Sequence, residues 1–149
     1  LTGKNDEKIG LTLTSYDDGT FNDINGVYLE YEAEKAYYKK IKRSVIKKID
    51  DEFLGLNEYS RVETLDSRRF IYTSDTCISL AHFLFRDEML DCKFFIRSSN
   101  TRDTLKYDLN FIKYLCKSVR DRLGLNEDIV TKIEVIINSA HVPSSIKHY

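Results

Sequence analysis

Three short polar stretches of this chain lie beside segments that are typical of β-strands, and they hold residues suited to binding phosphate. Asp66-Ser67-Arg68-Arg69 precedes a predicted strand, Arg97-Ser98-Ser99-Asn100 follows one, and Ser139-Ala140-His141 ends one. A rigid sheet presents functional groups at its strand ends. Arginine offers forked donors that match phosphate oxygens, and a serine hydroxyl adds another. Taken singly, each stretch is better explained by surface ion pairs with nearby carboxylates.

The cysteines and histidines exclude one class of site. Cys77, Cys92 and Cys116 show no paired close spacing, which fits free thiols in a reducing cytosol. The three histidines form no HxxxH cluster, and no CxxC motif is present. We therefore expect no metal site.

Together and in this order, the polar stretches resemble the thymidylate synthase and deoxycytidylate hydroxymethylase family. Arg68 and Arg69 match the family's phosphate-binding arginine pair, and Arg97-Ser98 is similar to its arginine-serine phosphate grip. His141 lies in a segment that resembles the one whose histidine helps to hold the nucleotide sugar. The resemblance covers residues 62–143 and implies a thymidylate synthase-like fold.

The resemblance also implies a nucleophile and a base-reading residue. Counting back from Arg97 reaches Cys77 at the nucleophile position, and counting forward reaches Asp108 at the base-reading position, without a gap. A thiolate that adds to C6 of a pyrimidine lets C5 attack a one-carbon electrophile. Nearby arginines would lower the pKa of such a thiol. An aspartate can accept from the amino edge of cytosine, so Asp108 favours a cytosine nucleotide.

The residues alone also allow simpler explanations than a nucleophile and a base-reading residue. Cys77 can be explained as a small residue of a strand. For Asp108, an ordinary exposed acid on a helix is an equal alternative.

The resemblance implies a pyrimidine deoxynucleoside monophosphate as ligand, methylenetetrahydrofolate as one-carbon donor, and a homodimer in which each subunit supplies Arg68 and Arg69 to the other. This sequence departs from the family mostly on the folate side. Thr76-Cys77-Ile78 replaces Pro-Cys-His, Asn100 replaces an aspartate, and there is no tryptophan.

Two functions therefore stay open. One is a C5 methyl- or hydroxymethyltransferase acting on dUMP or dCMP. The other is a catalytically inactive relative that senses a nucleotide or serves as a structural subunit of a larger assembly.

Composition sets the remaining limits. The chain has 149 residues with 42% hydrophobic and 32% charged, which suits one globular domain over residues 1–149. The net charge of −1 argues against general binding of nucleic acid. No apolar run is long enough to cross a membrane, and residues 1–8 show no signal peptide, so we expect a cytoplasmic protein.

Periodicity predicts the elements of the N-terminal half. Ile9–Tyr16 alternates as a half-buried strand does, and Val27–Leu29 is a candidate second strand after two turn signals. Glu32–Phe53 has helical spacing. Its predicted buried face is Tyr38, Ile41, Val45 and Ile49. The rest of that helix is crowded with Lys and Arg, which is more simply a solvated face than a binding surface for anions.

The C-terminal half predicts more strands than helices. Short strands are expected at Phe70–Thr73, Ile78–Phe85 and Cys92–Ile96, with Arg86–Met89 as a hairpin connection. An apolar stripe predicts a helix over Leu105–Leu123, stopped by Gly124, and the last strand is expected at Lys132–Val142. This order predicts an α+β fold, a mixed or antiparallel sheet layered with two main helices.

Overall fold

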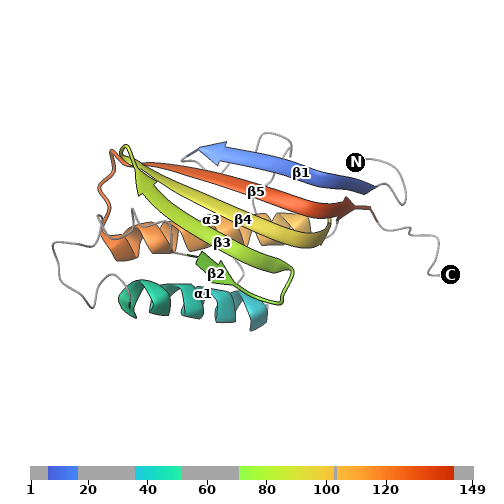
Figure 1. Ribbon diagram of the computed structural model, residues 1–149, viewed down its shortest axis with the longest axis horizontal. Coiled ribbons are helices and arrows are strands. Elements are labelled where there is room, and N and C mark those ends of the chain that lie inside the picture. Colours follow the sequence, from blue (N-terminus) through green and yellow to red (C-terminus); the bar gives the residue numbers. More distant parts are fainter. Residues whose placement is uncertain (1–6, 17–35, 52–70, 103, 143–149) are drawn as a thin grey trace.

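A five-stranded mixed sheet with two helices on one face forms the part of the chain that the computed structural model describes, residues 7–16, 36–51, 71–102 and 104–142 (Figure 1). The strand order is β1-β5-β4-β3-β2. The α+β prediction is thus confirmed. The elements are β1 (Glu7–Tyr16), α1 (Ala36–Ile49), β2 (Ile71–Thr73), β3 (Ile78–Arg86), β4 (Met89–Asn100), α3 (Leu105–Leu123) and β5 (Val130–His141).

The centre of the sheet is the parallel pair β4 and β5, joined through α3. Their register runs from Met89 opposite Val130 to Asn100 opposite His141. Parallel strands need a long crossover, and α3 supplies it on one face of the sheet. The outer strands pair antiparallel: β1 on β5, β3 on β4 and β2 on β3.

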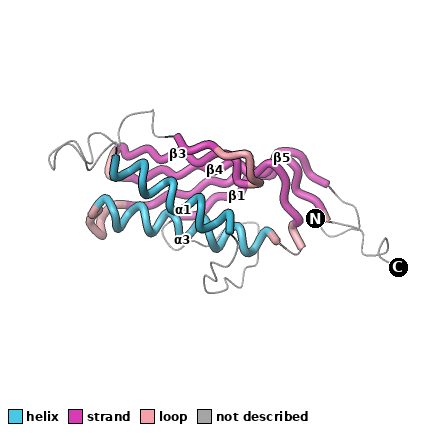
Figure 2. Tube along the Cα trace, turned by 90° about the horizontal axis from the view of Figure 1, so that it is seen from below, coloured by secondary structure: helices cyan, strands magenta, loops and turns pink. Residues whose placement is uncertain are grey.

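The core lies between the sheet and the two helices (Figure 2). Alternate residues of β4 face the helices and are buried, namely Leu90, Cys92, Phe94 and Ile96. The predicted buried faces of both helices are confirmed. On α1 these are Tyr38, Ile41, Val45 and Ile49, and on α3 they include Leu105, Leu109, Ile112, Cys116, Val119 and Leu123. None of the described helices is long and apolar enough to span a membrane.

The two helices lie side by side and run in the same direction. Each contact between them joins residues about seventy positions apart, at the start, the middle and the end of the pair. These contacts are Tyr37 and Tyr38 to Asp108, Lys42 to Tyr114, and Asp50 to Arg122.

Several predicted boundaries were wrong. The hairpin connection is only the two residues Asp87 and Glu88, whose φ angles of 51° and 59° fit a type I′ turn. β4 does not end at Ile96 but continues to Asn100, because its backbone stays paired with β5. β5 begins at Val130 and ends at His141. The predicted strand at Val27–Leu29 lies outside the described residues.

The end of α3 depends on a glycine in the left-handed region. Gly124 has φ 65° and ψ 34°. Its N–H donates to the carbonyl of Asp121, and the N–H of Leu125 donates to the carbonyl of Arg120. These are the two hydrogen bonds of a Schellman motif. A Cβ at Gly124 would meet no atom within 4 Å, so its cost is conformational only.

We predict that Gly124→Ala lowers the free energy of unfolding by about 1 kcal/mol, because alanine resists the left-handed region. Gly124→Asn should lower it less, since asparagine tolerates that conformation. Urea unfolding of both variants measures the difference. Equal stability of the alanine variant and the wild type would contradict this account of the helix end.

Candidate functional site

Five of the seven residues predicted for the site lie among the described residues, and four of these gather at one end of the sheet. At this end β4 and β5 finish, β3 begins, and both helices begin (right side of Figure 1). We call this the strand-end site and define it as Cys77, Arg97, Ser98, Asn100 and His141. Arg68 and Arg69 lie outside the described residues.

Cys77, which directly precedes β3, is hydrogen-bonded to Arg97 of β4. The backbone N–H of Arg97 donates to the Cys77 carbonyl at 2.8 Å, and the next residues, Ile78 and Ile96, are paired. Residues twenty positions apart in the sequence thus become neighbours. The thiol and the guanidinium therefore originate from adjoining backbone positions.

Hydrogen bonds fix the turn that leads into Cys77. The Ser74 hydroxyl accepts from the Thr76 backbone N–H at 3.0 Å, and the Thr76 hydroxyl donates to the Ile78 carbonyl at 3.1 Å. The Ser74 N–H donates to the Ser79 carbonyl at 3.0 Å. The position of Cys77 is therefore set on both sides by short-range bonds.

Cys77 is also the most accessible thiol of the chain. It is half-buried, whereas Cys92 and Cys116 are buried in the core. Burial, together with a hydrogen bond to Cys116, raises the pKa of the Cys92 thiol well above its ordinary value. A buried thiol with a raised pKa is a poor nucleophile. Among the three cysteines, Cys77 is the one placed to react.

The alternation of buried and accessible residues along β4 is interrupted after Ile96. Up to that residue every second side chain is buried, whereas the next buried side chain is that of Ser99 and Ser98 is half-buried. Arg97 is exposed. Ser99 is only 4% exposed, and its hydroxyl has no hydrogen-bond partner among the residues that the structure describes. Ser99 was not predicted as a site residue from the sequence.

Asn100 and His141 are tied to the turn that starts α3. The Asn100 side-chain oxygen accepts from the Arg102 N–H at 3.0 Å, and its carbonyl accepts from the Thr104 N–H at 3.0 Å. The His141 carbonyl accepts from both the N–H and the hydroxyl of Thr101, at 2.9 and 3.1 Å. Asn100 and His141 are also register partners.

Asp108 is buried inside the helix pair. It is 3% exposed, and its Oδ1 accepts hydrogen bonds from Tyr37 at 2.9 Å and from Tyr38. The alternative of an exposed helix acid was therefore wrong. The ring of Tyr38 also stacks on Phe111, with centroids 4.4 Å apart. Asp108 thus joins α1 to α3 just below the strand-end site.

The electrostatics of this end follow from the same contacts. Burial first, and the charge of Asp108 next, raise the pKa of Tyr38 above its ordinary value. The pKa of Tyr37 is also raised, mainly by burial, and a charge on Cys77 adds a small increase. Tyr37 therefore lies within electrostatic reach of both Asp108 and Cys77. Because both helices start at this end, their N-terminal dipoles favour an anion here.

No protein-family model matches the chain, and a search of curated proteins found no significant match.

We predict that Tyr38→Phe lowers the free energy of unfolding by about 2 kcal/mol, because it removes a donor from a buried carboxylate. Tyr107→Phe is the matched control, since Tyr107 lies on α3 and is 38% exposed. Its expected change is below about 0.5 kcal/mol. Chemical denaturation measures both, and equal effects of the two substitutions would contradict the role of Tyr38.

A pH dependence follows from the raised pKa values of Tyr37 and Tyr38. The stabilisation that the protonated tyrosines give to the folded state is fully present below the unfolded tyrosine pKa of about 10. It is lost as the pH rises above that value. We predict that the free energy of unfolding falls more steeply above pH 10 in the wild type than in Tyr37→Phe/Tyr38→Phe. The extra slope is up to about 1.4 kcal/mol per pH unit for each tyrosine. Parallel curves would contradict the prediction.

Proposed function

We propose that the chain binds a pyrimidine deoxynucleoside monophosphate at the strand-end site, as a thymidylate synthase-like protein of the cytoplasm. The observation that carries this proposal is the hydrogen bond between the Arg97 N–H and the Cys77 carbonyl. The family resemblance requires these two residues to be close, and they are neighbours in space although far apart in sequence.

In this proposal the phosphate lies against Arg97. The Ser98 hydroxyl, next to Arg97 in the chain, adds a donor there, as the resemblance implies. The starts of α1 and α3 contribute a favourable dipole field at the same end. Arg68 and Arg69, supplied by a second subunit in a homodimer, complete the grip as the resemblance implies.

The pyrimidine and the sugar then lie toward Cys77 and His141. The half-buried thiol of Cys77 can approach C6 of the ring. His141 is held by its carbonyl at the turn into α3, and it supports the sugar. The hydroxyls of Tyr37 and Tyr38 already donate to Asp108. Asp108 could therefore accept from the amino group of cytosine only in addition to these two tyrosines.

The folate side offers less support. The Asn100 side-chain oxygen, at the position of the family's aspartate, accepts from the Arg102 backbone N–H. This oxygen is therefore engaged in the turn before α3 and does not point to a role in binding methylenetetrahydrofolate.

The second candidate is a catalytically inactive relative that senses a nucleotide. The engagement of Asp108 by two tyrosines favours it, because the base-reading carboxylate is built into the packing between the helices. Binding is common to both candidates, and turnover separates them.

We predict that dCMP or dUMP binds to the wild type in isothermal titration calorimetry, and that Arg97→Ala weakens binding at least about tenfold by removing a charged donor. Arg86→Ala is the matched control, because Arg86 is an exposed arginine at the opposite end of the sheet. Binding of neither nucleotide, or equal loss in both variants, would rule out the strand-end site.

Exchange of tritium from C5 of the bound nucleotide into water tests catalysis. The Cys77 thiolate would add to C6, C5 would take a proton from solvent and release the tritium, and the thiolate would leave again. Exchange that vanishes in Cys77→Ser favours the transferase. Binding without exchange favours the inactive relative.

A further inference from the structure

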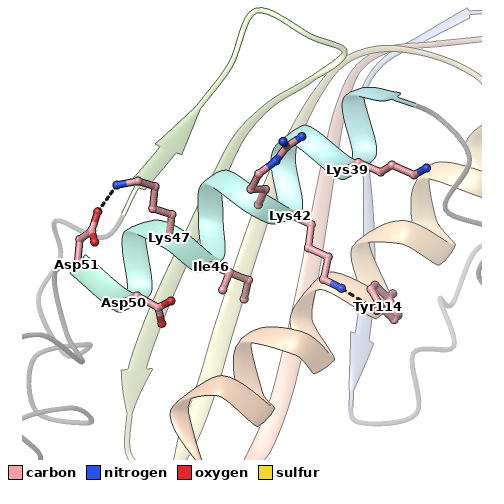
Figure 3. Close-up of a pocket in the computed structure, with 8 residues that line it drawn as sticks. Lys39, Lys42, Ile46, Lys47, Asp50, Asp51 and Tyr114 are labelled. Atoms are coloured by element: carbon pink, nitrogen blue, oxygen red, sulfur yellow. Dashed lines mark hydrogen bonds and ion pairs between the residues drawn. The ribbon is translucent and has the colours of Figure 1, made fainter.

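The outer surface of the helix layer carries a groove that the strand-end site does not use. It lies between α1 and α3 and has a volume of about 620 Å³ (Figure 3). We call it the α1–α3 groove. Its lining residues are Lys39, Lys42, Arg43, Ile46, Lys47, Asp50, Asp51 and Tyr114.

Positive charge is concentrated on the helix that forms one wall. α1 contains six basic residues and no acidic one, although the net charge of the chain is −1. The positive charge is therefore concentrated on one helix of a chain that is otherwise net acidic. A surface of this kind raises the local concentration of anionic partners.

The charge is also unequal along the groove. Lys39, Lys42 and Arg43 lie toward the start of α1, and among the described residues no carboxylate forms an ion pair with Lys39 or Arg43. At the other end Asp51 pairs with Lys47 at 2.6 Å, and Asp50 pairs with Arg122 at 2.7 Å. One end is thus cationic, and the other is neutralised by its own carboxylates.

Between these ends the groove offers apolar and aromatic surface. Ile46 is half-buried, and in Figure 3 it lies between the two helices. The Lys42 ammonium donates to the Tyr114 hydroxyl at 2.8 Å and lies 4.5 Å from the centre of its ring. This contact bridges the helices and holds the Tyr114 ring at the wall of the groove.

We propose that the α1–α3 groove docks an acidic amphipathic helix of a protein partner. Its carboxylates lie against Lys39 and Arg43, and its apolar face covers Ile46 and the ring of Tyr114. Helix-in-groove recognition combines an apolar stripe with flanking charges in this way. The proposal is independent of nucleotide binding at the strand-end site.

The neutralised end of the groove favours a peptide over a nucleic acid. A nucleic acid is negatively charged along its whole length. Laid along the groove, it would bring phosphates close to Asp50 and Asp51, where the basic side chains of Lys47 and Arg122 are already paired with these carboxylates. A peptide can carry its carboxylates at one end only and so match both ends of the groove.

Fluorescence anisotropy with a labelled synthetic peptide tests the proposal. The probe has about 18 residues, with leucine along one helical face and glutamate in its first turns. Two further probes are a peptide of the same composition with its leucines scrambled around the helix, and oligothymidylate of equal charge. We expect the amphipathic peptide to bind most tightly, and its affinity to fall as salt is raised.

Arg43→Glu should weaken binding of the amphipathic peptide about fivefold to tenfold. Lys40→Glu is the matched control, because Lys40 is an exposed residue of the same helix outside the groove and undergoes the same change of charge. It should change the affinity less than about twofold. Circular dichroism verifies that both variants fold.

Four results would overturn the proposal. These are no binding of the amphipathic peptide, equal affinity for the scrambled peptide, tighter binding of oligothymidylate, or equal effects of Arg43→Glu and Lys40→Glu. The last would mean that net charge alone attracts the peptide.

Discussion

The carboxylate of Asp108 is the constraint on which the arrangement of the two helices depends. A buried charge needs donors close by, and Tyr37 and Tyr38 of α1 provide them. Apolar stripes alone allow neighbouring helices to slide along each other, whereas a buried polar contact fixes one register. With this register set, Lys42 lies opposite Tyr114 and Asp50 opposite Arg122.

The same constraint links the two proposed sites. Asp108 lies one turn into α3, so fixing α1 against it also places the start of α1 beside Cys77 and the strand-end site. Further along the helices, the fixed register defines the walls of the α1–α3 groove. The nucleotide site that we propose is thus formed by the ends of the elements, and the peptide groove by their sides.

The fold was predictable where packing follows a simple period. The stripe of α3 predicted its bounds and its buried face, because every third or fourth residue faces the sheet. The end of β4 was not predicted, because the residues after Ile96 are polar and show no apolar strand pattern. The strand continues through them because their backbone pairs with β5. At the site, the closeness of Cys77 and Arg97 was anticipated from the resemblance. The burial of Asp108 was not, because its partners come from a helix seventy residues away.

The position of β1 has a consequence for how the chain folds as it is synthesised. β1 forms an edge of the sheet, and its pairing partner is β5, more than a hundred residues later. During translation, residues 7–16 leave the ribosome well before residues 130–141 exist to pair with them. The hairpin of β3 and β4 can form early from local contacts, whereas β1 must wait for the last strand. Until residues 130–141 have been synthesised, residues 7–16 therefore lack the strand with which they pair in the folded sheet.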